Sequence, residues 1–391
     1  MFRFTTFLLS LFVTCVVAAQ TREKCMVYGH VADFDTHAPL YNAKVYLYDG
    51  NAVFIDSMLV DRTDMNWKEG GFMCNKDVFP KGNYYLKIAY PGYYSPMIPF
   101  ELKDDSEPLP TIFLKKISTT GETVEKEYAW EPTNLEILKA SPAYAHDGAR
   151  NERFEYALPS DSLLTKTREE FNLDSIAGTG DDISRIKNLL YWVHNNIAHN
   201  GNNGFPEGPR SLSNIYHSSK RNNCGYNCRA LAISLAEAYL AVGIPARYLT
   251  CESKAWDTDG DCHVICVAWS KSLDKWIWVD PSFASYVTDE NGLLLHPGEV
   301  RFRLQHDMPL ILNEDANYNN EVKQTKEYYI ENYMAKNLYI FSAYMLQQAE
   351  PEGISNHPQG QVAALVPLKS NYNNATLITT DEEWFWQAPE Q

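Results

Sequence analysis

The sequence predicts a multidomain protein in which an N-terminal all-β antiparallel sandwich precedes an α+β core. A length of 391 residues suggests two or three domains. The first hundred or so residues alternate short β-rich runs with turn-forming residues, which is typical of a sandwich. Residues 181–290 combine amphipathic helices with strands. Hydrophobic residues make up 45% of the chain, which is enough for real cores and excludes global disorder.

The N-terminus has the three regions of a signal peptide. Arg3 supplies a positive charge, residues 7–17 are apolar, and Val17, Ala18 and Ala19 provide the small residues of a cleavage site. We therefore expect residues 1–19 to be a signal peptide and the protein to be exported, periplasmic or extracellular. A buried N-terminal helix is the alternative. No stretch reaches the ~18 apolar residues of a membrane-spanning helix, so we do not expect a transmembrane protein.

The charge of the chain limits its partners. A formal net charge of −16 argues against nucleic acid and anionic membranes, since both require a basic face on the protein.

Residues 25–116 are predicted to form the sandwich. The runs 26–31, 43–48 and 83–90 are rich in β-forming residues. Turn-forming residues separate them, at Pro39, Asp49-Gly50, Gly70-Gly71, Pro80-Lys81-Gly82 and Pro91-Gly92. Residues 117–180 form a polar, partly helical connector. Residues 291–391 form a C-terminal extension whose aromatic segments are expected to pack on the core.

The core, residues 181–290, begins with an amphipathic helix. Its apolar residues recur at helical spacing, at Ile183, Ile186, Leu189, Leu190, Val193 and Ile197. A second helix begins near Cys228 and ends at Gly243. Strands are predicted over residues 246–251, 263–269 and 276–279, and Arg247 is expected to anchor a buried carboxylate or carbonyl.

Three residues of this core fit thiol chemistry. Cys228 lies at the predicted start of a helix, where unpaired N–H groups and the helix dipole favour a thiolate. A nucleophilic cysteine needs a base, and the base needs an orienting group. His263 opens one strand and Asp280 follows the next, so two neighbouring strand ends can present an imidazole and a carboxylate side by side.

The remaining cysteines allow other uses. Seven cysteines follow the predicted signal peptide, and an odd number in an exported chain indicates a free thiol. If that thiol is Cys228, six could pair, with Cys25 and Cys74 the simplest pair. Zinc binding by Cys224-x3-Cys228 and Cys262-x3-Cys266 is the rival, but His263 would crowd the second pair. We expect no metal and no cofactor.

The order of short motifs in the N-terminal region resembles the carboxypeptidase-regulatory-like, transthyretin-type sandwich. These motifs are Gly29-His30-Val31-Ala32-Asp33, Pro39-Leu40-x-Asn42-Ala43-x-Val45-x-Leu47, Gly71-Phe72 and Gly82-x-Tyr84-x-Leu86. The resemblance implies a non-catalytic spacer or binding unit.

The core resembles the transglutaminase-like superfamily. The motifs are Cys228-Arg229-Ala230-Leu231-Ala232, Gly243-Ile244-Pro245-Ala246-Arg247-Tyr248, His263-Val264-x-Cys266-Val267-Ala268-Trp269 and Trp278-Val279-Asp280-Pro281-Ser282. The resemblance implies a papain-like α+β fold with Cys228 as nucleophile, His263 as general base and then acid, and Asp280 as the group that orients it.

One glycine near Cys228 departs from the family pattern, and two other residues nearby are candidates for roles in the site. Gly225 lies three residues before Cys228 rather than two, which alters the oxyanion loop, and Cys224 is the rival nucleophile. Asn222 lies six residues before Cys228, where papain-like enzymes carry an amide, and is our oxyanion candidate. We interpret His194, His199 and His217 as helix-face or loop residues.

We therefore predict acyl transfer on amide bonds of proteins or peptides, with hydrolysis favoured over cross-linking. A non-catalytic binding or scaffold protein of the cell envelope is the alternative.

Overall fold

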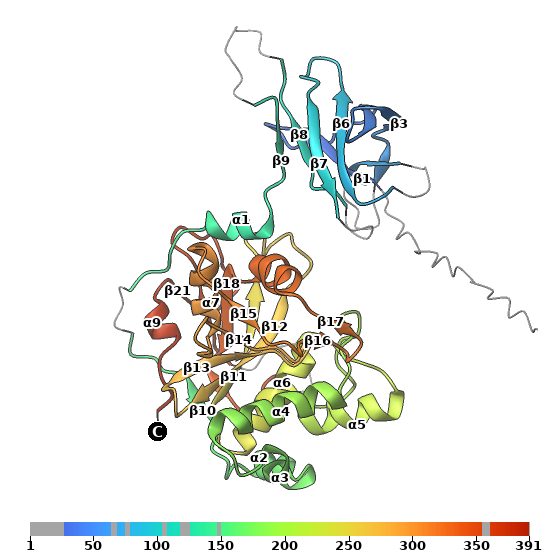
Figure 1. The fold of residues 1–391 in the computed structure, drawn as a ribbon. Coiled ribbons are helices and arrows are strands. Elements are labelled where there is room, and N and C mark those ends of the chain that lie inside the picture. Colours follow the sequence, from blue (N-terminus) through green and yellow to red (C-terminus); the bar gives the residue numbers. More distant parts are fainter. Residues whose placement is uncertain are drawn as a thin grey trace, which may run out of the picture. The chain divides into compact units, whose positions relative to one another are not determined.

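The computed structural model describes residues 27–63, 69–74, 79–103, 108–117, 126–146, 150–353 and 360–390. The chain divides into two compact units, Met1–Pro132 and Thr133–Gln391 (Figure 1). The predicted signal peptide and Cys25 lie outside the described residues. Within the described part of the chain, every helix is too short or too polar to cross a membrane.

The N-terminal unit contains two sheets, which confirms the predicted sandwich. One sheet has the order β4 (Arg62–Thr63), β5 (Glu69–Met73), β1 (Tyr28–Asp33), β8 (Ile112–Leu114) and β9 (Tyr128–Trp130). The other has the order β3 (Phe54–Leu59), β2 (Lys44–Asp49), β6 (Gly82–Ala89) and β7 (Met97–Leu102).

The sandwich differs from the expected one in two respects. Strand β1 pairs with β8 in parallel, so the first sheet is mixed. Strand β9 pairs with β8 and therefore extends the unit beyond the expected boundary at residue 116. The parallel pairing leaves no local pattern in the sequence, because β1 and β8 lie about 80 residues apart in the chain.

A six-stranded sheet forms the centre of the second unit. Its order is β13 (Lys275–Val279), β12 (His263–Ser270), β11 (Ala246–Glu252), β18 (Ile340–Tyr344), β20 (Val362–Leu365) and β21 (Leu377–Thr379). The first five strands are antiparallel to their neighbours, and β21 is parallel to β20. The region expected to pack on the core as an extension thus supplies three strands of the core sheet itself.

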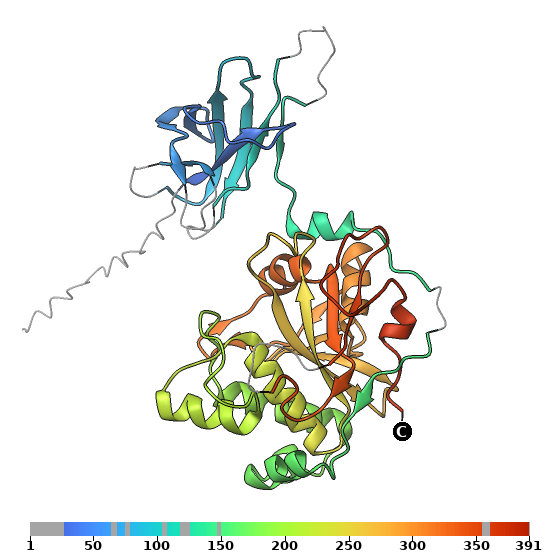
Figure 2. The same cartoon turned by 180° about the vertical axis from the view of Figure 1, so that it is seen from behind.

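Helices cover both faces of this sheet (Figures 1 and 2). One face carries α2 (Ser162–Glu170), α3 (Leu173–Ala177), α4 (Asp182–Asn196), α5 (Leu212–Asn222) and α6 (Cys228–Ala241). The other carries α1 (Asn134–Lys139), α7 (Pro297–Gln305), the π-helix η1 (Lys326–Met334), α8 (Ala335–Asn337) and α9 (Glu382–Phe385). Alternation along β12 produces the two cores, since Val264, Cys266 and Ala268 face one side and Ile265 and Val267 the other.

Three short strand pairs complete the unit. They are β10 (Glu155–Tyr156) with β19 (Leu346–Gln347), β14 (Val287–Thr288) with β15 (Ile311–Leu312), and β16 (Asn317–Tyr318) with β17 (Val322–Lys323).

The fully buried guanidinium of Arg247 ties the C-terminal segment to the sheet. It donates hydrogen bonds to the carbonyl oxygens of Phe385 at 2.5 Å and Gln387 at 3.1 Å, and to the Tyr156 hydroxyl at 2.6 Å. The rings of Phe154 and Trp276 lie 3.7 and 4.4 Å from the guanidinium carbon. The expectation that Arg247 anchors a buried carbonyl is confirmed.

Replacing Arg247 by Lys is expected to lower the free energy of unfolding by about 1–3 kcal/mol, because an ammonium group cannot satisfy three oxygens in the fork geometry of a guanidinium. Urea denaturation measures the change. Arg168→Lys, in an exposed ion pair with Asp174, is the control and should change stability by less than about 1 kcal/mol. Equal effects of the two substitutions would contradict the anchoring role.

Candidate active site

Cys228 is the first residue of α6, as predicted. The side chain of Asn227 caps the helix by accepting a hydrogen bond from the Ala230 N–H at 3.0 Å. The cap fixes the first turn, so the thiol lies at the positive end of a buried fourteen-residue helix. This position favours a thiolate over a neutral thiol.

The segment that leads into α6 runs along residues 198–200. The Tyr226 N–H donates to the Ala198 carbonyl at 3.0 Å, and the Asn200 N–H donates to the Tyr226 carbonyl at 2.8 Å. Gly225 makes this approach possible, because a Cβ atom there would lie 2.5 Å from the Ala198 oxygen. The glycine that departs from the family pattern therefore has a local role in placing residues 198–200 beside the helix start.

His263 and Asp280 lie together at the ends of neighbouring strands, as predicted. His263 opens β12, and Asp280 follows β13 directly. The His263 Nε2 atom lies 2.7 Å from Asp280 Oδ2, and both side chains are almost completely buried. Because Nε2 is engaged by the carboxylate, Nδ1 is the nitrogen that can share a proton with the Cys228 thiol.

Two further donors hold the Asp280 carboxylate. The Tyr329 hydroxyl donates to Oδ2 at 2.5 Å, and the Ser282 N–H donates to Oδ1 at 2.8 Å. Tyr329 is itself fixed by the Ser285 hydroxyl at 2.8 Å. These hydrogen bonds therefore hold the Asp280 carboxylate in a fixed position beside His263. Tyr329 could not be predicted from the sequence, because its position depends on the rare i→i+5 geometry of the π-helix η1, which often occurs at functional sites.

The site stabilises a charged pair. Burial alone would raise the pKa of the Cys228 thiol, but hydrogen bonds from His199 and His263, and the charge on His263, lower it to about 6. Burial opposes protonation of His263, but the charge of Asp280 and its hydrogen bond raise the imidazole pKa to about 10. Between these two values the thiolate and the imidazolium are both charged.

Aromatic rings and a second histidine shape the surroundings of His263. The rings of Tyr333 and Phe283 lie 5.2 and 5.7 Å from its own ring, both edge-on. His194 is buried, with Nδ1 2.9 Å from the Pro281 carbonyl and Nε2 3.0 Å from Asn317 Oδ1. His194 therefore fixes the residue that follows Asp280, a structural role consistent with its position on a helix face.

His199 is the second imidazole at the thiol. It is one of the groups that lower the pKa of the Cys228 thiol, and its Nδ1 lies 3.1 Å from the Tyr318 hydroxyl. We interpreted it from sequence as a loop histidine, and it does lie in a loop, but that loop is brought against the nucleophile. No local signal marks it, because the contact depends on the pairing of residues 198–200 with the segment before α6.

Asn222, the oxyanion candidate, lies elsewhere. It is the exposed last residue of α5. The structure therefore gives no support to the role expected of Asn222.

The other cysteines near the site are free thiols. No disulfide joins the described residues Cys224, Cys228, Cys251, Cys262 and Cys266, and Cys25 of the expected pair with Cys74 lies outside the described residues. Cys224 is half-buried beside Tyr226 rather than at a helix start. Among the residues that the structure describes, no group of His, Cys, Asp and Glu is arranged to hold a metal ion.

A polar pocket of about 800 Å³ lies near the start of α6. Its walls include Asn227 and Arg229, on either side of Cys228 in the chain, and Cys262, next to His263. Glu352 is buried and pairs with both Arg229, at 2.6 Å, and Arg210. The walls of this pocket near the start of α6 therefore carry both charged and hydrogen-bonding groups.

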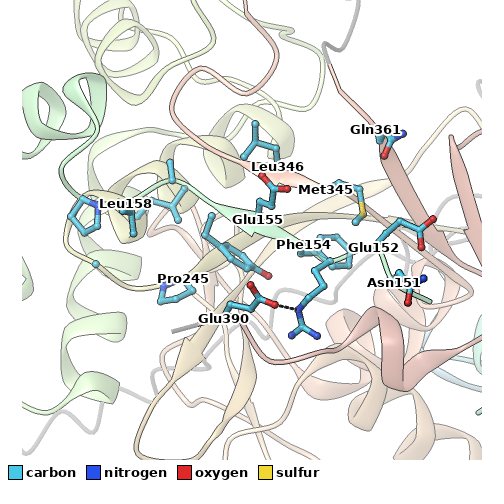
Figure 3. A pocket seen from close by; sticks show the side chains of 16 residues that line it. Asn151, Glu152, Phe154, Glu155, Leu158, Pro245, Met345, Leu346, Gln361 and Glu390 are labelled. Carbon is cyan, nitrogen blue, oxygen red and sulfur yellow. Dashed lines mark ion pairs between the residues drawn. The ribbon is translucent and has the colours of Figure 1, made fainter. Parts of the chain in front are cut away.

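A second pocket, of about 880 Å³, lies at the other end of α6 (Figure 3). Leu240 and Gly243 line it together with residues 151–159, and an ion pair of 2.6 Å joins Arg153 to Glu390 at its rim. Leu240 lies twelve positions after Cys228 along the helix, a distance of roughly 18 Å at the usual rise per residue. This pocket is therefore too far from the thiol to hold the reacting group.

The sequence matches one family. Residues 169–281 match the family model described as the transglutaminase-like superfamily. No curated protein matches the chain.

Several solved structures are similar at low identity. Red sea bream transglutaminase is 12% identical with a TM-score of 0.22, over 67% of this chain and 48% of that one, so the chain spans about half its length. A candidate cysteine protease from Cytophaga hutchinsonii is 12% identical with a TM-score of 0.25, over 69% and 78% of the two chains. Klebsiella pneumoniae 5-hydroxyisourate hydrolase is 13% identical with a TM-score of 0.18, over 24% and 92%.

The family match covers the helices α4–α6 and the strands β11–β13, which together carry Cys228, His263 and Asp280. Residues 169–281 are a transglutaminase-like domain within the α+β unit.

Proposed function

We propose that the protein is a thiol-dependent acyl-transfer enzyme that acts on amide bonds of protein or peptide substrates, with hydrolysis as its usual outcome. One observation carries the proposal. The Nε2 atom of His263 is held 2.7 Å from the buried Asp280 carboxylate, and the charge of this imidazole lowers the pKa of the Cys228 thiol at the start of α6. This is the arrangement of nucleophile, base and orienting group that covalent acyl transfer requires.

In the first half-reaction, the Cys228 thiolate attacks the carbonyl carbon of the amide. The new S–C bond pushes the carbonyl π electrons onto oxygen, which becomes an oxyanion. When the oxyanion collapses, the C–N bond breaks, and the leaving nitrogen takes the proton from Nδ1 of the His263 imidazolium. The products of this step are a free amine and a thioester on Cys228.

In the second half-reaction, His263 is neutral and accepts a proton from an incoming nucleophile. Water attacks the thioester, the C–S bond breaks, and a carboxylic acid leaves while the thiolate–imidazolium pair is restored. An amine in place of water would give transamidation through the same steps. We favour hydrolysis because water needs no second binding site on the protein.

Throughout the cycle, Asp280 keeps the His263 ring in one tautomer and one orientation. It stays ionised, because burial would raise its pKa but the charge and hydrogen bond of His263 and the Tyr329 hydroxyl hold that pKa below its ordinary value. The substrate chain would lie in the polar pocket near the start of α6, between Arg229 and Cys262.

The thiol pKa can be measured by alkylation. Because the pKa of Cys228 is lowered to about 6, its rate of reaction with iodoacetamide should reach half of its plateau near that pH. Peptide mapping should place the first label on Cys228. Cys224→Ser should keep this fast phase and Cys228→Ser should lose it. First labelling at Cys224, or a midpoint near the ~8.5 of an ordinary thiol, would contradict the assignment.

Acyl transfer can be tested with p-nitrophenyl acetate, in which the thiolate displaces p-nitrophenolate and becomes an acetyl thioester. We expect a burst of about one p-nitrophenolate per active site and an acetyl group mapped to Cys228, with Cys228→Ala slower by about a thousandfold or more. Absence of acetyl-Cys228 would favour the non-catalytic scaffold.

A second experiment, with casein and a fluorescent primary amine, distinguishes hydrolysis from cross-linking. Hydrolysis predicts new N-termini on casein without incorporation of the amine, whereas incorporation of the amine alone would indicate cross-linking.

A further inference from the structure

The polar pocket near the start of α6 is built on one face of the core sheet. Alternate residues of a strand point to the same face, and Tyr248, Thr250 and Glu252 of β11 all line the pocket. On β18, Ser342, which pairs with Thr250, and Tyr344 continue this floor. The start of α6 and segments far apart in the chain form the walls, so only the folded unit assembles the pocket.

A guanidinium group forms the wall of the pocket at α6. Arg229 donates from Nε to Glu352 Oε1 at 2.6 Å, and the other carboxylate oxygen of Glu352 pairs with Arg210. The Glu352 side chain is 3% exposed and the Arg229 side chain 32%, so Glu352 holds Arg229 from the protein side. This carboxylate does not use the terminal amino groups of Arg229. Their N–H groups form a planar fork that fits the two oxygens of a ligand carboxylate.

A negative charge lies on the floor of the same pocket. Glu252 Oε2 accepts a hydrogen bond from the neutral Tyr372 hydroxyl at 2.8 Å, and among the described residues no basic side chain forms an ion pair with Glu252. Burial raises the pKa of this carboxyl group, while the Tyr372 hydrogen bond and the charge of Arg229 oppose the rise. A half-buried carboxylate in this setting favours an ammonium group as its ligand.

The Tyr248 hydroxyl is a further polar group on the floor. The residue is 2% exposed, and its hydroxyl has no hydrogen-bond partner among the residues that the structure describes. A buried hydroxyl of this kind has lost its hydrogen bonds to water and gained none in return. A polar ligand in the pocket can provide the missing partner.

These groups together favour one kind of ligand. An uncharged ligand would leave the terminal donors of Arg229 and the charge of Glu252 unsatisfied, and a ligand with a single charge would leave one of them so. We propose that the pocket binds an amino-acid head group, that is, one carbon atom that carries a free ammonium and a free carboxylate, with Arg229 as the partner of the carboxylate and Glu252 as the partner of the ammonium. This inference rests on the proposed acyl-transfer function and names its substrate class.

The head group belongs to the acyl part of the substrate. Arg229 follows Cys228 directly in α6, whereas the leaving nitrogen must face His263, which protonates it. A group bound to Arg229 therefore stays joined to the carbonyl carbon that forms the thioester. A γ-glutamyl peptide meets this condition, because its scissile carbonyl lies on the side chain and its head group is free. Hydrolysis of its amide releases an amine and then glutamate with a free γ-carboxyl group.

Four p-nitroanilides with the same four-carbon acyl chain separate the two charges. γ-Glutamyl p-nitroanilide, in its L and D forms, carries both charges. Glutaryl p-nitroanilide carries only the carboxylate, 4-aminobutyryl p-nitroanilide only the ammonium, and butyryl p-nitroanilide neither. Release of p-nitroaniline gives kcat/KM for each probe.

Binding is measured apart from the chemistry in Cys228→Ala. Titration calorimetry would use the corresponding primary amides, which are glutamine in its L and D forms, glutaric monoamide, 4-aminobutyramide and butyramide. Arg229→Gln and Glu252→Gln each remove one charge of the pocket, whereas Arg229→Lys keeps the charge without the fork. Arg221→Gln and Glu169→Gln are matched controls, since both residues are exposed on other helices, α5 and α2.

The unaltered protein should hydrolyse one form of γ-glutamyl p-nitroanilide about 10–100-fold faster than the glutaryl and 4-aminobutyryl probes, and the butyryl probe most slowly. Glu252→Gln should lose the preference for the ammonium and keep that for the carboxylate, and Arg229→Gln the reverse. Arg229→Lys should keep part of the carboxylate preference, and the two controls should keep both preferences. Each preference is a ratio of two probes within one variant, so a general loss of folded enzyme cancels.

Equal rates for the four probes, or preferences that survive both Arg229→Gln and Glu252→Gln, would overturn the proposal. If no probe releases p-nitroaniline but Cys228→Ala binds glutamine more tightly than the other amides, the pocket is supported and acyl transfer is wrong. If the butyryl probe is hydrolysed as fast as the γ-glutamyl probe and the amides bind alike, acyl transfer stands and the pocket proposal is wrong. Neither turnover nor selective binding would contradict both.

Discussion

The buried hydrogen bond between His263 and Asp280 is the interaction on which the site depends. A carboxylate and an imidazole that are both removed from water would ordinarily become neutral, since burial disfavours each charged form. Here they hold each other charged at 2.7 Å, with Tyr329 and Ser282 as further donors to the carboxylate. The retained negative charge makes His263 a strong base, and the resulting imidazolium stabilises a thiolate at Cys228.

The surrounding fold fixes the relative positions of His263 and Asp280. The antiparallel register of β12 and β13 brings the start of one strand near the end of the other, and His194 fixes Pro281 just beyond Asp280. The π-helix η1 contributes Tyr329 and Tyr333 from the opposite layer. The thiol comes from α6 on the other face of the sheet. The site therefore depends on the packing of all three layers and not on any one motif.

The sequence predicts those parts of the site that depend on local pattern. Cys228 at a helix start and His263 and Asp280 at strand ends follow from helical periodicity and strand order, and the structure brings all three together. His199 and Tyr329 could not be found in this way, because each reaches the site through long-range pairing or an uncommon helix geometry. The same reason applies to β18, β20 and β21, whose membership in the core sheet is fixed only by pairing with distant strands.

The most direct test of this account is the protonation state of His263, followed by nitrogen NMR of its ring as a function of pH. The account predicts that both ring nitrogens remain protonated at a pH of about 8 and that the ring titrates near 10. Replacement of Cys228 by Ser should lower that pKa, because the thiolate contributes to it. A His263 ring that is already neutral at a pH of about 8, with the ordinary pKa of about 6.5, would contradict the thiolate–imidazolium pair.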